Sequence, residues 1–243
     1  MKVIPLSEGS FTIDKSKLFI PFNETTDELQ SRPKGSLLVE VQPFVVITSE
    51  DVLLLDTGLG FEKDGVLQIH KNLMDAGINP SEVTKILLSH LHKDHAGGVS
   101  RKIDGKCQLS FPNATYYLQK RELNFAFEKG FPSYITEELE PLKNAANVQL
   151  LEGEGVLSGY IKYEVTAAHC PYHQVYWIVD GGETIFFGGD DAPQLQQMRT
   201  KYIAKYDYDG KKCMELRQEW WKRGREEGWE FLFYHDIKTP MYR

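Results

Sequence analysis

The chain lacks any long hydrophobic run. No apolar stretch approaches the ~18 residues that a membrane-spanning helix requires, and residues 1–8 contain no apolar core of a signal peptide. The sequence therefore predicts neither a membrane span nor an export signal. We expect a cytoplasmic protein that has no membrane partner.

Cysteine is scarce. Only Cys107, Cys170 and Cys213 are present, and their odd number and wide spacing argue against a disulfide framework. This use of cysteine is typical of proteins in a reducing compartment, which again favours the cytoplasm. We expect Cys170 to be a small buried side chain.

Positive charge is in the minority. The chain has 28 Lys and Arg residues against 35 Asp and Glu residues, which gives a formal net charge of −7. The one basic stretch, Lys222-Arg223-Arg225, is offset by Glu226 and Glu227. Because nucleic-acid-binding proteins usually carry a basic face, we expect no nucleic-acid partner.

Short apolar runs alternate with helical patterns along the 243 residues, without a repeat or a linker. Strands are predicted at residues 10–14, 37–48, 52–55, 86–88, 115–118, 148–151, 161–165, 175–179, 184–187 and 231–234. Helices are predicted at residues 66–76, 120–128, 135–144 and 212–227. We expect one domain, residues 1–243, with an α/β (α+β) fold of two mixed β-sheets packed together and helices outside. Residues 21–35 are predicted to form a polar loop that borders a pocket.

The most informative segment is His90-Leu91-His92-Lys93-Asp94-His95, which follows the apolar run Ile86-Leu87-Leu88. Three histidines and a carboxylate within six positions suit Zn²⁺ and similar metals. The position between a strand and Gly97-Gly98 predicts a strand-to-helix loop. Such a loop can present ligands to two adjacent metal ions.

Other metal-type side chains also follow apolar runs. They are Asp56, His169, His173, Asp190 and His235. Since sheets commonly present functional groups where their strands end, we expect these side chains to gather with residues 90–95, which we call the histidine-rich loop. We expect Asp191 only to shape or cap its loop.

The motif and the order of the residues that surround it resemble those of the metallo-β-lactamase superfamily along nearly the whole chain. The resemblance implies a four-layer αβ/βα sandwich with two metal ions at one edge. It implies metal ligands at His90, His92, Asp94, His95, His169, Asp190 and His235. His90, His92 and His169 would bind one ion, and Asp94, His95 and His235 the other, with Asp190 bridging the two.

Two further residues are expected to support the ligands without binding metal. The resemblance implies that Asp56 orients the loop or a ligand histidine, and we expect His173 to have a supporting or structural role. Zn²⁺ is the expected metal, with Fe²⁺ or Mn²⁺ also compatible with these ligands.

Two divalent ions ~3.5–4 Å apart can share one hydroxide and make it a nucleophile near neutral pH. Asp94 is the expected catalytic residue, because it can orient the hydroxide and carry its proton toward the leaving group. The sequence contains no nucleophile elbow, so we expect a metal-dependent hydrolase.

Three segments are similar to those of the quorum-quenching N-acyl-homoserine lactonases: the run from His90 to Gly98, His169-x-Pro171-x-His173-Gln174, and Tyr234-His235-Asp236-Ile237. The resemblance implies a small-molecule substrate, an ester or an N-acyl-homoserine-lactone-like lactone. These lactonases have a tyrosine three residues after the bridging aspartate, where this chain has Pro193. Candidates for a replacement phenol are Tyr172, Tyr202, Tyr206 and Tyr208.

The same set of metal ligands would also suit other functions, namely a phosphodiesterase, a thioesterase, a β-lactamase or a di-iron redox protein. The missing export signal argues against a β-lactamase, and the short C-terminal helix argues against a thioesterase. Di-iron relatives usually have glutamate where His92 stands, together with a flavin domain. A non-catalytic binding module would normally lose ligands, whereas all seven are present here. Trp220, Trp221 and Trp229 crowd into one segment, which predicts a homodimer.

Overall fold

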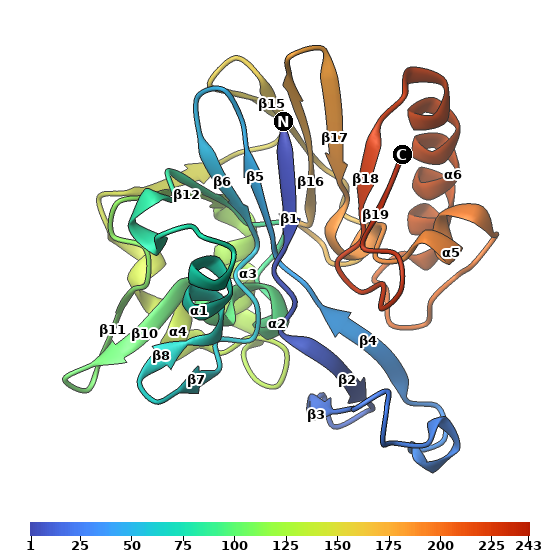
Figure 1. Ribbon diagram of the computed structural model, residues 1–243, viewed down its shortest axis with the longest axis horizontal. Helices are drawn as coiled ribbons and strands as arrows, with labels where there is room; N and C mark the ends of the chain where they lie inside the picture. The colour runs from blue at the N-terminus through green and yellow to red at the C-terminus, as the bar shows by residue number, and fades with distance from the viewer.

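Two six-stranded sheets form the centre of the computed structural model, which describes residues 1–243 (Figure 1). The first sheet has the order β1 (Lys2–Pro5), β5 (Phe44–Ile47), β6 (Val52–Leu55), β9 (Lys85–Leu87), β12 (Thr115–Gln119) and β13 (Val148–Leu151). The second has the order β14 (Gly155–Leu157), β15 (Ile161–Val165), β16 (Gln174–Asp180), β17 (Glu183–Phe187), β18 (Glu230–Leu232) and β19 (Met241–Tyr242). Each sheet combines parallel and antiparallel pairs, so the prediction of two mixed sheets is confirmed.

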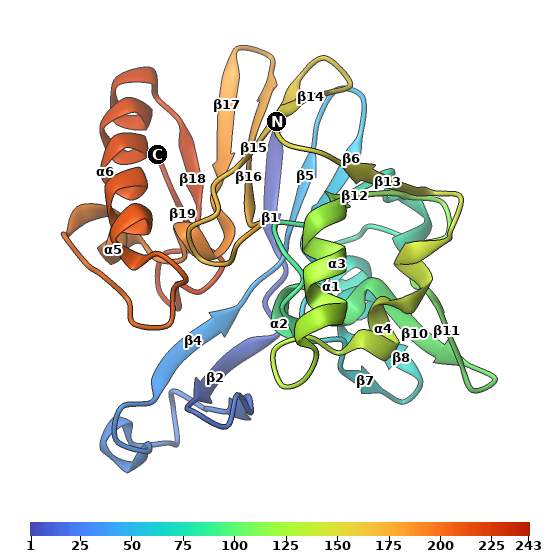
Figure 2. The ribbon, with the colours of Figure 1, turned by 180° about the vertical axis from the view of Figure 1, so that it is seen from behind.

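Helices cover the outer face of each sheet (Figures 1 and 2). Those on the first sheet are α1 (Gln68–Asp75), α2 (Lys93–Ala96), α3 (Lys120–Lys129) and α4 (Thr136–Leu139). Those on the second sheet are α5 (Leu195–Arg199) and α6 (Gly210–Glu227). The layers are therefore helix, sheet, sheet and helix, as the predicted αβ/βα sandwich requires.

The strand sequences explain this layering, because successive side chains of a strand point to opposite faces. In β6, Leu54 packs among the helices of the first sheet, whereas Leu53 and Leu55 pack between the two sheets. In β17, Phe186 packs toward α6, whereas Phe187 packs between the sheets. Strands that are apolar on both faces can be buried only in a structure with a covering layer on each side.

The crowded tryptophans lie largely inside the chain. Trp220 and Trp229 are buried against Trp177 and Phe186 in the layer between the second sheet and α6. This packing accounts for their crowding within one chain, and the homodimer stays a prediction.

Two predicted elements differ from the structure. The strand predicted at residues 37–48 is divided at Gln42-Pro43 into β4 (Leu37–Val41) and β5, which belong to different sheets. The helix predicted at residues 135–144 is α4 followed by a 3₁₀ turn, η4 (Glu140–Lys143), that contains Pro141. In both places proline lacks the backbone N–H that a continuous hydrogen-bonding pattern would use.

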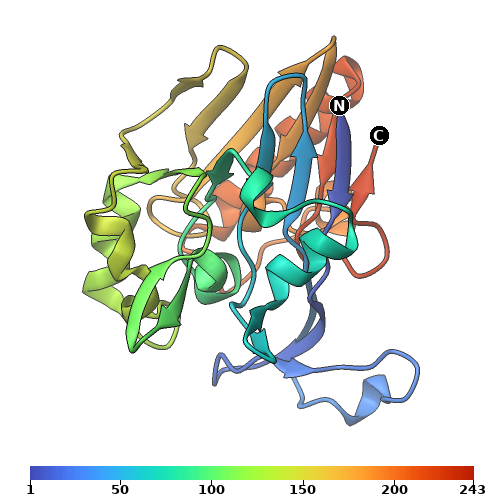
Figure 3. The same cartoon turned by 60° about the vertical axis from the view of Figure 1, so that its left-hand side comes forward.

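A small sheet projects from the sandwich as an arm (Figures 1 and 3). It consists of β2 (Gly9–Ile13), β3 (Ile20–Pro21) and β4, and η1 (Leu29–Ser31) lies in the β3–β4 connection. Residues of the predicted polar loop line a cavity of about 630 Å³ together with Glu8, Phe11 and Phe61. Two short hairpins, β7 (Glu62–Lys63) with β8 (Val66–Leu67) and β10 (Ser100–Ile103) with β11 (Lys106–Leu109), lie beside the first sheet. No helix of the structure is both long and apolar enough to cross a membrane.

Candidate metal centre

The seven side chains predicted as metal ligands all lie together at one edge of the sandwich. Each lies shortly after a strand: His90 and His92 in the loop after β9, Asp94 and His95 in α2, which follows that loop, and one residue each after β15, β17 and β18. The two sheets therefore contribute to the cluster jointly. It contains His90, His92, Asp94, His95, His169, Asp190 and His235.

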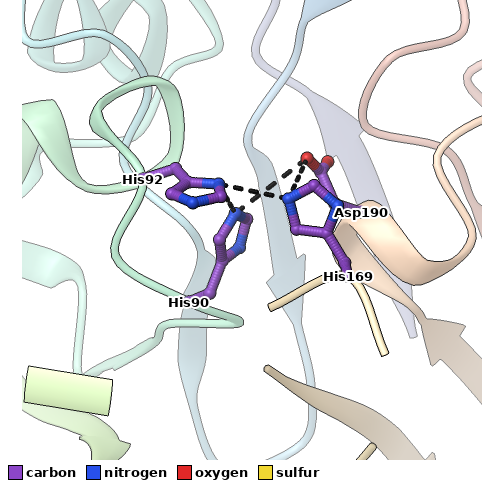
Figure 4. A group of neighbouring side chains, drawn as sticks. All are labelled: His90, His92, His169 and Asp190. Atoms are coloured by element: carbon purple, nitrogen blue, oxygen red, sulfur yellow. Dashed lines mark hydrogen bonds and ion pairs between the residues drawn. The ribbon is translucent and has the colours of Figure 1, made fainter. Parts of the chain in front are cut away.

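One group consists of three histidines and one carboxylate (Figure 4). The Nδ1 atom of His92 lies 2.9 Å from His90 Nε2 and 3.1 Å from His169 Nε2. Asp190 Oδ2 lies 3.2 Å from His169 Nε2 and 3.9 Å from His90 Nε2. The potential ligand atoms of this group lie within 4.8 Å of one another.

A second group lies beside the first and consists of Asp94, His95 and His235, again with potential ligand atoms within 4.8 Å of one another. Asp94 Oδ2 lies 3.7 Å from His95 Nε2 and 3.5 Å from His235 Nε2. The other oxygen of Asp190, Oδ1, lies 3.1 Å from His95 Nε2 and 3.0 Å from His235 Nε2. The two oxygens of Asp190 thus face different groups.

Hydrogen bonding within the protein leaves two buried polar atoms of the cluster without a partner. Buried polar atoms normally have a hydrogen-bond partner, yet His95 Nε2 and Asp190 Oδ1 have none. Imidazole nitrogens and carboxylate oxygens that converge at these distances are the donor set of Zn²⁺, Fe²⁺ or Mn²⁺ sites. The residues present therefore fit a divalent cation in each group.

The electrostatics of the two groups also suit cations. Burial lowers the pKa of His90 and His92 well below the usual value, so both rings are neutral and have a lone pair to offer. Burial also acts to lower the pKa of His95 and His235, but the Asp190 and Asp94 carboxylates outweigh it and raise both. The centre therefore attracts positive charge, which a bound dication would supply.

Asp56 and His173 lie where supporting residues are expected. Asp56 Oδ2 lies 2.7 Å from His95 Nδ1, and Ser89 donates to the same carboxylate from its backbone N–H and its hydroxyl, each at 2.7 Å. His173 Nε2 accepts a hydrogen bond from the Asp190 backbone N–H at 3.1 Å. His173 belongs to neither ligand group, so its contact is with the loop that presents Asp190.

Other supporting contacts were missed by the sequence analysis. Asp207 Oδ1 lies 2.9 Å from His169 Nδ1, the Ser89 hydroxyl lies 3.0 Å from His90 Nδ1, and the Glu40 carbonyl oxygen lies 2.6 Å from His235 Nδ1. No apolar run precedes Asp207, so no sequence signal pointed to it. Each contact fixes the ring of a candidate ligand from its far side.

Asp191 has a larger part than the loop-shaping one expected of it. It is fully buried, its Oδ1 accepts a hydrogen bond from the His169 backbone N–H at 2.7 Å, and its Oδ2 lies 3.0 Å from His173 Nδ1. The nearby His173 holds the pKa of Asp191 down at about 2 against the effect of burial. This carboxylate joins the loops that present His169 and Asp190. Its position beside Asp190 was the signal available in the sequence.

Glu122 of α3 holds the histidine-rich loop in place through a hydrogen bond to its backbone. Its Oε1 accepts hydrogen bonds from the Leu91 backbone N–H at 3.1 Å and from the Tyr134 hydroxyl at 3.3 Å. The Cys170 thiol donates to Oε2 at 3.5 Å, and Cys170 is buried, as expected of a small filler beside His169.

Of the four tyrosines considered for the missing phenol, Tyr206 has a ring contact with a candidate ligand. Its ring centroid lies 6.3 Å from that of His169. Tyr172 packs on Phe125, with ring centroids 5.9 Å apart. Tyr202 and Tyr208 are exposed, and so is Tyr206.

Known proteins resemble this chain in sequence and in fold. N-acyl homoserine lactonase AttM of Agrobacterium fabrum is 29% identical over 111 residues, which are 42% of this chain and 38% of that protein. The chain thus aligns with less than half the length of this relative. A probable metal-dependent hydrolase from Staphylococcus aureus superposes with a TM-score of 0.78 at 20% identity, covering 99% of this chain and 91% of the other. AidC, a dizinc quorum-quenching lactonase, superposes with a TM-score of 0.73 at 19% identity, covering 98% and 88%.

The family match covers most of the chain. Residues 39–222 match the family model of the Metallo-beta-lactamase superfamily, and this segment includes six of the seven clustered side chains. His235, the seventh, lies beyond it. Together with the sandwich fold and the geometry of the cluster, this match shows that the chain belongs to the metallo-beta-lactamase superfamily.

Proposed function

We propose that the chain is a dinuclear metal-dependent hydrolase of a small ester or lactone. The position of Asp190 carries this proposal. One of its oxygens faces His90 and His169, and the other faces His95 and His235. A carboxylate placed in this way is suited to bridge two ions.

In this proposal His90, His92 and His169 hold one ion, and Asp94, His95 and His235 hold the second. Zinc is the proposed metal, and this choice is supported by the dizinc lactonase AidC, whose fold this chain shares. Bound divalent ions would polarise the substrate carbonyl and lower the pKa of a water molecule.

Asp94 is the proposed catalytic residue. Its carboxylate lies between His95 and His235, and its backbone carbonyl accepts a hydrogen bond from the Tyr234 hydroxyl at 2.6 Å. Tyr234 in turn stacks on His95, with ring centroids 4.0 Å apart. Held in this way, the Asp94 carboxylate can accept the proton of the attacking water and deliver it to the leaving oxygen.

The names of the relatives support the substrate class. AttM is named an N-acyl homoserine lactonase, and AidC is described in complex with the product of such a lactone. We therefore propose an N-acyl-homoserine-lactone-like ester or lactone as substrate.

All three cysteines are unpaired, which supports the cytoplasmic location predicted from the sequence.

Elemental analysis of purified, zinc-reloaded protein tests the metal site, and hydrolysis of four substrates by the same sample tests the activity. The substrates are a lactone, an aryl ester, a cephalosporin and a bis-aryl phosphodiester. We expect two ions per chain and turnover of the lactone or the aryl ester. Two ions with turnover of only the phosphodiester or the cephalosporin would reject the substrate class, and fewer than one ion would reject the site.

Two variants test the residues. His92→Ala and Asp190→Ala each remove a ligand, so we expect hydrolysis to be abolished while the protein stays folded. The matched control is Asp64→Asn, which changes an exposed turn residue whose φ of +54° asparagine also tolerates. Full activity in either ligand variant would contradict the assignment.

A further inference from the structure

Two lysines lie beside His92 at the place where the arm meets the sandwich. Lys93 belongs to the histidine-rich loop, and its ammonium lies 5.8 Å from the ring centroid of Phe19 and 5.9 Å from that of Phe131. Phe19 belongs to the β2–β3 turn of the arm, and Phe131 to the loop between α3 and α4. These two segments lie side by side in both opposite views (Figures 1 and 2). Lys17 lies two residues before Phe19 in the same turn.

Neither lysine forms an ion pair or a side-chain hydrogen bond within the protein. Eight other lysines have a carboxylate within 4.0 Å, whereas Lys17 and Lys93 have no such partner and no side-chain hydrogen bond. All the remaining unpaired lysines are exposed, and only these two are half-buried. Because partial burial of an unpaired charge costs free energy, their shared location calls for an explanation.

The backbone holds both lysines in place. Lys17 has a φ of +60°, a left-handed conformation that lysine rarely adopts. Its backbone N–H donates to the Asp14 carbonyl at 3.1 Å. The Lys93 backbone N–H donates to the Ser133 carbonyl at 2.9 Å, which ties the histidine-rich loop to the α3–α4 loop. Strained backbone of this kind tends to gather at ligand-binding sites.

Lys93 stands between the candidate ligands His92 and Asp94 in the sequence, and Phe19, whose ring its ammonium approaches, follows Lys17 by two residues. Burial and the Lys17 charge lower the pKa of Lys93, whereas the Asp94 and Glu138 carboxylates act in the opposite direction. The two lysine charges therefore act on one another beside His92, in a region that also contains the Asp94 and Glu138 carboxylates.

We propose that Lys17 and Lys93 form an anion-binding subsite, and that the substrate is an ester or lactone that carries a carboxylate or phosphate group near the bond to be cleaved. This inference rests on the proposed hydrolase function. The ring of Phe131 is 75% exposed and offers an apolar surface to the adjoining part of such a substrate. An oxyanion between the two ammonium groups would neutralise both and relieve their mutual repulsion.

A matched pair of lactones tests the subsite: γ-butyrolactone, which is neutral, and 5-oxotetrahydrofuran-2-carboxylate, which is anionic. The measured quantity is the ratio of kcat/KM for the anionic lactone to kcat/KM for the neutral one. We expect Lys17→Gln and Lys93→Gln each to lower this ratio about tenfold through KM, and Lys93→Arg to retain most of it. Lys15→Gln, which removes an exposed charge from the same turn, is the control and keeps the ratio of the unaltered protein.

Direct binding provides a second measurement. Glutarate and inorganic phosphate are titrated by calorimetry into the zinc-loaded protein and into the Lys17→Gln/Lys93→Gln variant, whose folding is checked by thermal unfolding. We expect at least fivefold weaker binding of one or both anions to the variant, and the stronger effect identifies the carboxylate or the phosphate as the preferred group.

The outcomes separate the two proposals. Lysine-dependent anion binding in a protein that hydrolyses neither lactone would reject the hydrolase function and keep the subsite. Lactone turnover with the ratio and the anion affinities unaffected by the variants would reject the subsite and keep the function. Equal losses on both lactones, with anion affinity retained, would assign the lysines a structural role and overturn the inference.

Discussion

Among single residues, the supporting carboxylates decide how firmly the candidate ligands are held. Asp207 is the clearest case, because its Oδ1 lies 2.9 Å from His169 Nδ1 and its side chain is only 1% exposed. We expect Asp207→Asn to weaken zinc affinity about 10- to 100-fold, the usual effect of losing such a partner. Competition with a chromogenic chelator measures this, with Asp64→Asn as control. Unaltered affinity would mean that Asp207 does not position His169.

Glu8 makes stability depend on pH. Burial raises its pKa to about 7 from 4.5, because Oε2 has only the Leu59 backbone N–H as donor and buried Oε1 has no partner. Between these two values the unfolded chain loses the proton while the folded chain keeps it, so the folded state loses stability as pH rises. Glu8→Gln removes this loss. We therefore expect the free energy of unfolding of the Glu8→Gln variant, minus that of the unaltered protein, to rise by about 2 kcal/mol from pH 5 to pH 8.

Urea unfolding at both pH values, with excess zinc throughout, measures the effect of Glu8→Gln. Glu24→Gln, at an exposed position nearby, is the control and shows no such trend. A stability difference that stays constant with pH would contradict a raised pKa for Glu8.

The candidate histidine ligands could be predicted from the sequence, whereas Asp207 and Glu122, which support them, could not. The histidines stand out because each follows an apolar run at the end of a strand, so a local pattern is enough to place them. No apolar run precedes Asp207, and Glu122 lies within the predicted helix 120–128, where a glutamate is an ordinary residue. They reach the centre only because a surface loop and α3 fold back against it, and that contact is set by tertiary packing.

At the scale of elements, Gly97 and Gly98 allow the histidine-rich loop to pack closely against the backbone of the loop that follows β6. A Cβ atom on Gly97 would lie 2.4 Å from the backbone of Leu59, and one on Gly98 would lie 2.2 Å from the Thr57 carbonyl oxygen. Gly97 has an ordinary φ of −62°, so space rather than backbone conformation requires glycine there. The loop after β6, which begins at Asp56, can therefore lie directly against the ligand loop.

Gly97→Ala is expected to destabilise the protein by about 3 kcal/mol, because backbone rather than a mobile side chain must move. Chemical denaturation measures the change. The control Gly105→Ala has open space around its Cβ and only the strain of a φ of +77°, so we expect a loss of about 1 kcal/mol. Equal losses in the two variants would show that this close packing tolerates a methyl group.

The sequence predicted most of the central strands and two strands of the arm, β2 and β4, but not that the arm forms a sheet of its own. Alternating apolar residues identify strands buried in the sandwich, whereas β2, β3 and β4 form a small sheet at its margin, with the exposed Ile20 and Leu37. Residues 37–48 read as one strand because both halves are apolar. Only the sheet pairing shows that the first half joins β2 and the second joins β1 and β6.

Across the whole molecule, the candidate metal centre joins the two halves of the chain. His90, His92, Asp94 and His95 follow a strand of the first sheet, whereas His169, Asp190 and His235 follow strands of the second. Each proposed ion takes ligands from both sheets. Binding of the proposed ions would therefore stabilise the packing of the sheets as well as the geometry of the site.

Removal of the metal should consequently lower the melting temperature. A ligand at 100 times its Kd stabilises the folded state by about 2.7 kcal/mol, and 1 kcal/mol corresponds to about 2–4 °C for a chain of this size. We expect treatment with a chelator to lower Tm by about 5–10 °C for each site emptied, and added zinc to restore it in a concentration-dependent way. Differential scanning calorimetry measures the shift, and Asp190→Ala should have a low Tm that zinc raises much less. A Tm that is independent of zinc in the unaltered protein would mean that the clustered side chains do not bind it across the two sheets.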